Sequence, residues 1–256
     1  MRRAMSLPAL LAAATSDGAS LTAHVAPEWL QGRTAYGGLT AAVAYAAAAR
    51  LTPHLPPLRS VQIAFVGPLA ETIRAEPTLL RRGRNTAFIS CDVSGETGIG
   101  VRALFLFAAA RESSVTWAPP IDAPPPPATA IVMPAAAPRF MSNFDLASAG
   151  DEPEGGFRRW VRLKHRDRLD RAVELIAIAD ALPPAAVALT PKFGPVSTMA
   201  WQLNLTTDAP ATADGWWLID SVTLDAGDGT SSQAMTIRNR DGDTVATATQ
   251  SVALFY

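Results

Sequence analysis

Residues 170–201 read DRAVELIAIADALPPAAVALTPKFGPVSTMAW and contain the clearest candidate for a buried helix. The segment Ala172–Leu182 is apolar almost all the way round, which is typical of a helix enclosed by other structure. Pro183 and Pro184 follow it and cannot continue a helix. Asp180 therefore falls in the last turn, where the helix macrodipole disfavours a carboxylate. We expect the pKa of Asp180 to be perturbed, which makes it a candidate functional residue.

A second interpretation of Asp180 stays open on this evidence. An aspartate at a helix end can accept hydrogen bonds from backbone N–H groups of the following turn, here the Pro-Pro turn. Its role would then be structural. The other acid of the segment, Glu174, lies on a different face and has Arg171 three residues before it as an ion-pair partner.

Strand-like runs surround this helix in the sequence. Four of them follow the helix and two precede it, with the hairpin signal Asp241-Gly242 between the last two. The predicted strands are Phe140–Leu146, Phe157–Lys164, Ser197–Thr206, Trp216–Leu224, Ser231–Asn239 and Thr244–Phe255.

The first half of the chain shows the same order of elements. An Ala-rich helix, Leu39–Leu51, follows one strand and precedes four more. The predicted strands are Ser20–Val25, Leu58–Val66, Ile73–Arg81, Thr86–Ser94 and Val101–Ala109. Hairpin spacing predicts an antiparallel sheet with the helix against one face. The repeated order indicates an internal duplication, with two halves of similar structure.

A proline-rich segment separates the halves. Residues Val115–Pro138 contain prolines 119, 120, 124 to 127, 134 and 138, a composition typical of an extended connector rather than a sheet interior. We therefore expect a first unit over residues 1–114, a linker over 115–138 and a second unit over 139–256.

Composition excludes several classes of function. The formal net charge of −1 gives no electrostatic reason to expect nucleic acid or an anionic membrane as partner. No segment approaches the ~20 apolar residues that span a bilayer, and we expect the N-terminus to open with an amphipathic helix rather than a secretory signal. Cys91 is the only cysteine, so we expect a reducing, cytoplasmic location. The three histidines have no zinc-site spacing, so no metal site is expected.

Four stretches, one of them within residues 170–201, carry a resemblance to a known family. They are YGGLTAAVAYAAAARL (36–51) followed by LRSVQIAFVGPL, RRGRNTAFISCDV (81–93), ELIAIADALPPAAV, and IRNRDGDTVATATQSVAL (237–254). Together they resemble the type II acyl-CoA thioesterase family, whose members have two fused hotdog folds. The resemblance spans nearly the whole chain and implies an α+β double hotdog, each half a long central helix wrapped by an antiparallel sheet.

The resemblance also implies a set of site residues. Asp180 and Gln250 fall on the family's catalytic aspartate and glutamine. The third polar residue of the family matches Thr198 best, with Ser197 as the near alternative. Tyr36, Gly37 and Gly38 correspond to the family's Gly-Gly helix start and are expected to contact substrate.

The first half is not expected to carry a second complete site. Its position corresponding to Gln250 falls in the apolar run Ala103–Ala110. Two departures from the family pattern are the many prolines of the linker and the apolar Ala181, Leu182 and Pro183 beside the aspartate.

These residue types fit thioester hydrolysis. Asp180 is the candidate for the general base that activates water, and a raised pKa would bring its basicity near operating pH. The Gln250 amide can hold the water, and Thr198 can join the same network. Backbone N–H groups at Gly37-Gly38 lack intrahelical partners and can stabilise an oxyanion. This chemistry needs no metal or organic cofactor, since coenzyme A belongs to the substrate.

We therefore expect an acyl-CoA thioesterase that acts in fatty-acid metabolism as a homodimer or larger homo-oligomer. Two alternatives remain at this stage: an acyl-CoA-binding hotdog protein without catalysis, and a hotdog hydratase or dehydratase. The second alternative usually needs a site histidine, and none lies near Asp180 in sequence. No G-x-S-x-G motif supports a serine hydrolase. The acyl chain length does not follow from the sequence.

Overall fold

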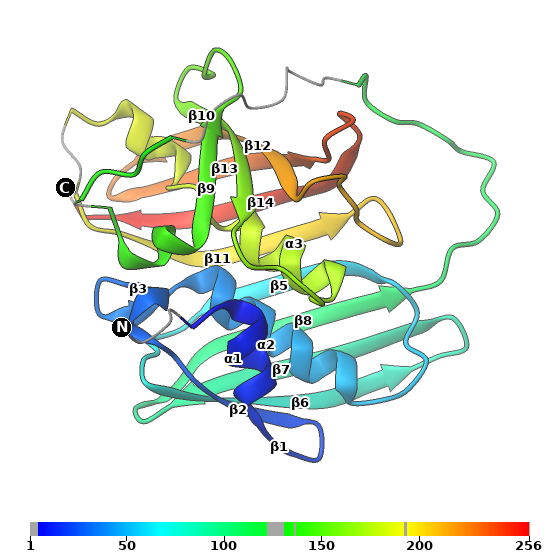
Figure 1. Cartoon of the computed structure of the whole chain (residues 1–256). Helices are drawn as coiled ribbons and strands as arrows, with labels where there is room; N and C mark the ends of the chain where they lie inside the picture. The colour runs from blue at the N-terminus through cyan, green and yellow to red at the C-terminus, as the bar shows by residue number, and fades with distance from the viewer. Residues whose placement is uncertain (1–4, 122–130, 136, 192–193, 256) are drawn as a thin grey trace.

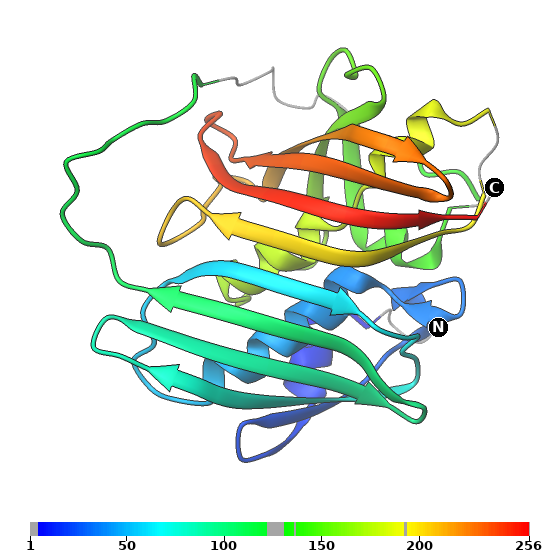
Figure 2. The same ribbon diagram turned by 180° about the vertical axis from the view of Figure 1, so that it is seen from behind.

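The computed structural model describes residues 5–121, 131–135, 137–191 and 194–255 (Figure 1). Its main feature is one antiparallel sheet that runs through both halves of the chain, and twelve strands of it lie in the described residues. Their order is β1-β2-β6-β7-β8-β5-β11-β14-β13-β12-β10-β9. The helices α2 and α3 cover one face of this sheet, and the other face is open when the molecule is turned round (Figure 2).

The first half supplies the strands from β1 to β8. The sheet strands are β1 Thr15–Asp17, β2 Ser20–His24, β5 Leu58–Phe65, β6 Thr72–Arg82, β7 Thr86–Gly95 and β8 Gly98–Ala108. The short strands β3 Leu30–Gln31 and β4 Thr34–Ala35 form a separate hairpin. The helical elements are α1 Leu7–Ala13, η1 Pro27–Trp29 and α2 Gly37–Arg50. The expected N-terminal helix is therefore present.

The second half supplies the remaining elements. Its strands are β9 Phe144–Ser148, β10 Gly156–Leu163, β11 Val196–Leu205, β12 Trp216–Gly227, β13 Thr230–Arg238 and β14 Thr244–Leu254. Its helices are η2 Arg139–Asn143, α3 Arg171–Ala179 and η3 Ala185–Leu189.

The two halves have mirrored strand orders about the seam between β5 and β11. From the seam outward, the first half reads β5-β8-β7-β6-β2 and the second reads β11-β14-β13-β12-β10. At the seam Gln62 pairs with Gln202. Both seam strands also carry a β-bulge at the same distance from that pair, at Arg59 and at Met199. Each strand of the twelve-stranded sheet thus has a structural counterpart in the other half.

The helix α2 is buried because its side chains are small and apolar. Its Ala-rich residues, from Gly38 to Ala48, are mostly buried against α3 and the strands β6, β7 and β8. Small side chains allow close approach of helices and sheet, and burial of this surface stabilises the fold at roughly 25 cal/mol per Å² of apolar area. The N-cap of α3 is Asp170, whose carboxylate accepts the N–H groups of Ala172 and Val173.

Two predicted boundaries were wrong. The helix predicted over Ala172–Leu182 ends at Ala179, so it is short rather than long, and Asp180 is its C-cap residue, with φ −100° and ψ 8°. The strand predicted over Phe140–Leu146 begins only at Phe144. Residues before it form η2, in which the Met141 N–H bonds to the Pro138 carbonyl and the Asn143 side chain donates hydrogen bonds to the carbonyls of Phe140 and Glu28.

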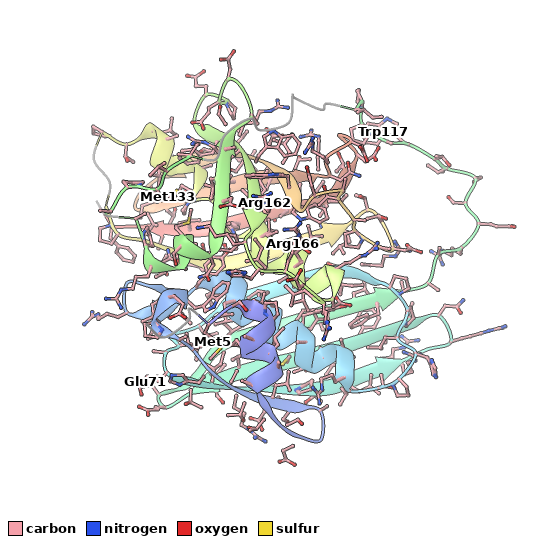
Figure 3. All side chains as sticks on the ribbon, viewed as in Figure 1. Met5, Glu71, Trp117, Met133, Arg162 and Arg166 are labelled. Atoms are coloured by element: carbon pink, nitrogen blue, oxygen red, sulfur yellow. The ribbon has the colours of Figure 1, made fainter. Side chains whose placement is uncertain are left out.

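The proline-rich linker leaves the sheet after β8. Residues 122–130 and 136 of the predicted linker lie outside the described residues. The described part up to Ile121 has no helix or strand, and Trp117 on it is 81% exposed. Figure 3 shows Trp117 on this segment, well away from the two central helices. No helix in the described ranges has the length and apolar character needed to cross a membrane.

Candidate active site

Asp180 lies where the start of α2 meets the end of α3, so both halves build its surroundings. Its side chain is partly buried, and the Gln250 amide of β14 donates a hydrogen bond from Nε2 to Oδ1 at 2.9 Å. The backbone N–H of Gly38, at the start of α2, donates a second hydrogen bond to the carboxylate. The alternative role for Asp180 in the Pro-Pro turn is not what the structure shows, because these partners come from α2 and β14.

Burial raises the pKa of Asp180 to about 7. The largest cause is desolvation, which disfavours the charged form. The hydrogen bonds from Gln250 and Gly38 act in the opposite direction and favour the carboxylate. The predicted perturbation of the pKa is thus confirmed, and its main cause is the apolar surround, while the Gly38 N–H at the N-terminus of α2 favours the negative charge.

Gly37 has no room for a side chain. A Cβ atom built there would lie 2.7 Å from Oδ2 of Asp180 and 3.0 Å from the Phe65 ring, which ends β5. Within the described ranges, its own N–H group has no hydrogen-bond acceptor, whereas the N–H groups of Leu39 and Thr40 bond to the Tyr36 carbonyl. A donor free of protein partners therefore lies beside the carboxylate.

Tyr36 holds the two helices together. Its side chain is fully buried, and its hydroxyl donates to the carbonyl of Ala177 in α3 at 2.7 Å. The ring stacks on Phe140 with centroids 4.2 Å apart. Burial, with the nearby Asp180 as a second cause, raises the pKa of Tyr36 well above its usual value. These contacts describe a structural role, and the predicted contact of Tyr36 with substrate stays a prediction.

Gln250 has a second partner that the sequence did not reveal. The Gln233 amide of β13, directly opposite in the ladder, donates from Nε2 to Oε1 of Gln250 at 3.0 Å. Gln233 in turn accepts the backbone N–H of Ala185, at the start of η3, with a distance of 2.6 Å. Both glutamines are buried, at 2% and 5% exposure. No sequence signal marks Gln233, because its partners are far away in the chain and its neighbours are ordinary strand residues.

Thr198 lies on the site-facing side of β11 but does not bond to the other two residues. It pairs with the buried Val252, and the next pair that faces inward joins Trp201 and Gln250. The alternative, Ser197, is exposed and pairs with Ala253. In the described ranges no hydrogen bond joins the Thr198 hydroxyl to Asp180 or Gln250. The structure thus favours Thr198 over Ser197 by position, and its role stays a prediction.

The corresponding place in the first half is apolar. The mirrored register puts Phe105 of β8 at the position of Gln250, and Ile89 of β7 at the position of Gln233. Tyr45 of α2 packs edge-on against Phe105, with centroids 5.7 Å apart. The expectation that the counterpart of Gln250 falls in the run Ala103–Ala110 is confirmed.

A hollow of about 640 Å³ lies on the other face of the sheet and is not the site described above. Its walls are solvent-facing residues of the central strands, among them Gln62, Gln202 and Thr249. Gln250 borders the hollow through its backbone, because side chains alternate along a strand and its amide points to Asp180.

Metal-binding groups do not gather in the described part of the chain. It contains no cluster of three or more His, Cys, Asp or Glu side chains that could hold an ion. The single cysteine, Cys91, is buried in β7, and burial raises the pKa of its thiol to about 12, so it is not a ready nucleophile.

Comparisons with known proteins match both halves. A family model described as the acyl-CoA thioesterase N-terminal domain matches residues 25–108, and one described as the acyl-CoA thioesterase C-terminal domain matches residues 116–254. Among curated proteins, none matches this sequence.

Solved structures share the fold over nearly the whole chain. A hotdog-fold protein of unknown function from Alicyclobacillus acidocaldarius has a TM-score of 0.83 at 22% identity, covering 96% of this chain and 97% of its own. A tesB protein of Mycobacterium avium subspecies paratuberculosis has a TM-score of 0.81 at 19% identity, covering 98% of each chain. Acyl-CoA thioesterase II TesB2 from Mycobacterium marinum has a TM-score of 0.73 at 17% identity, covering 98% and 97%. The predicted α+β double-hotdog fold is confirmed.

Proposed function

Because this chain belongs to the acyl-CoA thioesterase family, we propose that it hydrolyses acyl-CoA thioesters to free acid and coenzyme A at the site around Asp180. The observation that carries the proposal is the hydrogen bond from Gln250 to the Asp180 carboxylate, within a surround that raises the pKa of that acid to about 7. A general base is most effective when its pKa lies near the operating pH.

The proposed reaction begins with a water molecule held beside the hydrogen-bonded side chains of Asp180 and Gln250. Asp180 takes a proton from the water as the oxygen attacks the thioester carbonyl carbon, and Gln250 orients the water through its amide. The backbone N–H of Gly37, which has no acceptor within the described ranges, polarises the carbonyl oxygen, where negative charge develops. The C–S bond then breaks, and the thiolate of coenzyme A takes the proton from Asp180. Thr198 contributes a hydroxyl from the same side of the sheet.

The remaining features of the proposal follow from this chemistry. The reaction as written uses no metal or organic cofactor, so chelators such as EDTA should leave the rate unchanged. A buried, reduced Cys91 suits the cytoplasm, where fatty-acid metabolism supplies acyl-CoA. We also propose a homodimer or larger homo-oligomer.

The first experiment compares the wild type with Asp180→Asn on short, medium, long and aromatic acyl-CoA substrates, with release of the free thiol as the readout. We expect turnover by the wild type and a loss of at least ~100-fold in Asp180→Asn, the usual scale for a lost general base. Gln250→Ala should lose less, because a water molecule can replace part of one amide. Circular dichroism of each variant checks that the fold is kept.

Absence of turnover by the wild type on every acyl-CoA would support the alternative of a binding protein without catalysis. Turnover that does not depend on Asp180 would overturn the proposed site. Hydration of an enoyl-CoA would point to the hydratase alternative, although no histidine of the described residues is among the groups that shift the pKa of Asp180.

A further inference from the structure

The orientation of the Gln250 amide decides whether it helps or opposes the Asp180 carboxylate. With Nε2 toward Asp180, the amide donates a hydrogen bond to the charged oxygen. Rotated by 180°, it would bring Oε1 to the carboxylate, and two acceptors would face each other in a buried place. An amide side chain has the same shape in both orientations, so only its hydrogen-bond partners select one.

The hydrogen bonds that link Ala185, Gln233, Gln250 and Asp180 have a direction that is fixed at Ala185. The Ala185 N–H is a backbone group and can only donate, so the atom of Gln233 that it meets at 2.6 Å must be the amide oxygen. The Nε2 group of Gln233 therefore faces Gln250, which must present its own oxygen. Gln250 is left with its N–H toward Asp180.

We propose that Gln233 is a positioning residue, which transmits the fixed direction of the Ala185 N–H to the Gln250 amide and thereby keeps a hydrogen-bond donor on the Asp180 carboxylate. The consequence for catalysis rests on the proposed function, but the effect on Asp180 does not. The counterparts in the first half, Ile89 and Phe105, are apolar and cannot form such a chain of hydrogen bonds.

The groups around Asp180 are otherwise neutral in the described structure. From the start of α2 come Gly37, Gly38 and the Tyr36 phenol, which burial keeps protonated. The end of β5 contributes the Phe65 ring, and β14 contributes Gln250. Loss of the Gln250 donor should therefore act directly on the protonation of Asp180.

The test compares Gln233→Met, which is neutral and of similar length, with Gln202→Met as matched control. Gln202 lies on β11, where it is exposed on the opposite face of the sheet. The pKa of Asp180 is measured by carbon-13 NMR titration of the protein labelled at aspartate, with Asp180→Asn to assign the signal. The pH profile of kcat is measured on the same proteins.

We expect Gln233→Met to raise the pKa of Asp180 and to lower kcat near pH 7 about tenfold, the rate equivalent of one hydrogen bond. Gln202→Met should change neither. In a Gln250→Ala background, Gln233→Met should have no further effect, because it acts through Gln250. The buried side chain of Gln233→Glu, when protonated, can still accept from Ala185 and donate to Gln250, so this variant should restore kcat at pH 6.

The inference would be overturned if Gln233→Met left both the pKa of Asp180 and kcat unchanged. It would also be overturned if Gln233→Met lowered kcat as much in the Gln250→Ala background as in the wild type, because Gln233 would then act only by supporting η3. If Gln233→Met does not fold, kcat of Gln233→Glu is measured at pH values below and above the pKa of the introduced carboxyl. The inference requires a higher kcat, relative to the wild type at the same pH, where that carboxyl is protonated and can donate to Gln250. An Asp180 pKa that responds to Gln233 in a protein without thioesterase activity would uphold the inference and refute the proposed function.

Discussion

At the scale of single residues, Asp180 is set between two opposing effects. Removal from water favours its protonated form, whereas the donors Gln250 and Gly38 favour the carboxylate. The net result is an acid whose pKa of about 7 lies far above that of an ordinary aspartate. A small change in its neighbours therefore changes its charge at neutral pH.

This pKa predicts the pH dependence of the reaction. Only the carboxylate can accept a proton from water, so kcat/KM should rise with pH through about 7 and level off above it. The rise follows the ionisation of Asp180 in the free enzyme. The measurement is kcat/KM from pH 5 to 9 with one acyl-CoA. If kcat/KM rose near pH 4 instead, Asp180 would behave as an acid exposed to water, contrary to its burial.

A second prediction concerns Gly37, where replacement by alanine should be harmful although helix propensity alone favours alanine. Alanine is favoured over glycine in a helix by about 1 kcal/mol, but here its Cβ would press on Asp180 and Phe65. We expect Gly37→Ala to lower kcat/KM at least ~10-fold. Gly227→Ala is the control, because a Cβ there meets nothing within 4 Å. Equal activity of both variants would contradict the close approach.

At the scale of elements, the start of α2 is fastened to the end of α3 by Tyr36. Its hydroxyl satisfies the Ala177 carbonyl, which lies in the last turn of α3 and has no N–H four residues on in the helix to accept. The same contact brings Gly37 and Gly38 to Asp180. The site therefore depends on a contact between helices as well as on its own polar groups.

Tyr36→Phe tests this contact. Leaving a buried carbonyl without its donor costs about 1–3 kcal/mol, so the free energy of unfolding in urea should fall by that amount. Tyr45→Phe, within α2, is the control, because no hydrogen bond of the Tyr45 hydroxyl occurs in the described ranges. We expect the control to stay within about 0.5 kcal/mol of the wild type.

Most helices and strands could be predicted from the sequence, because each buries an apolar face with the period of its type. The end of α3 could not, since the last residues before Pro183 are equally apolar and the pattern does not show that Asp180 leaves the helical conformation as the C-cap residue. The start of β9 was also predicted wrongly, because Phe140 stacks on the Tyr36 ring, a contact between distant residues that the local pattern does not show. Asp180 and Gln250 were found through family motifs, whereas Gln233 depends on a register that no local pattern encodes.

At the scale of the whole molecule, the seam between β5 and β11 makes one sheet out of two halves. It leaves β1 and β9 at the ends of the sheet and an open face opposite the helices. Exposed strand edges favour pairing with another chain. The domain boundaries at residues 114 and 139 remain predictions. The internal duplication behind them is tested by overlaying the two halves, in which case α2 should superpose on α3.

We expect the protein to associate into a homodimer or larger assembly. Light scattering coupled to size-exclusion chromatography at micromolar concentration should give a mass of at least twice 27.0 kDa. The mass should not depend on salt if apolar surface drives the association. A monomer at every concentration tested would contradict this expectation.

The mirrored halves have a consequence for how such a protein can change by mutation. In a symmetric pair of identical chains, every substitution occurs twice, so a residue lost from one site is lost from both. In this single chain the counterparts Phe105 and Gln250 are encoded separately. The first half can therefore exchange polar groups for apolar ones and gain packing, while the second half keeps its acid and amides. Covalent fusion thus frees each half to evolve under a different selection pressure.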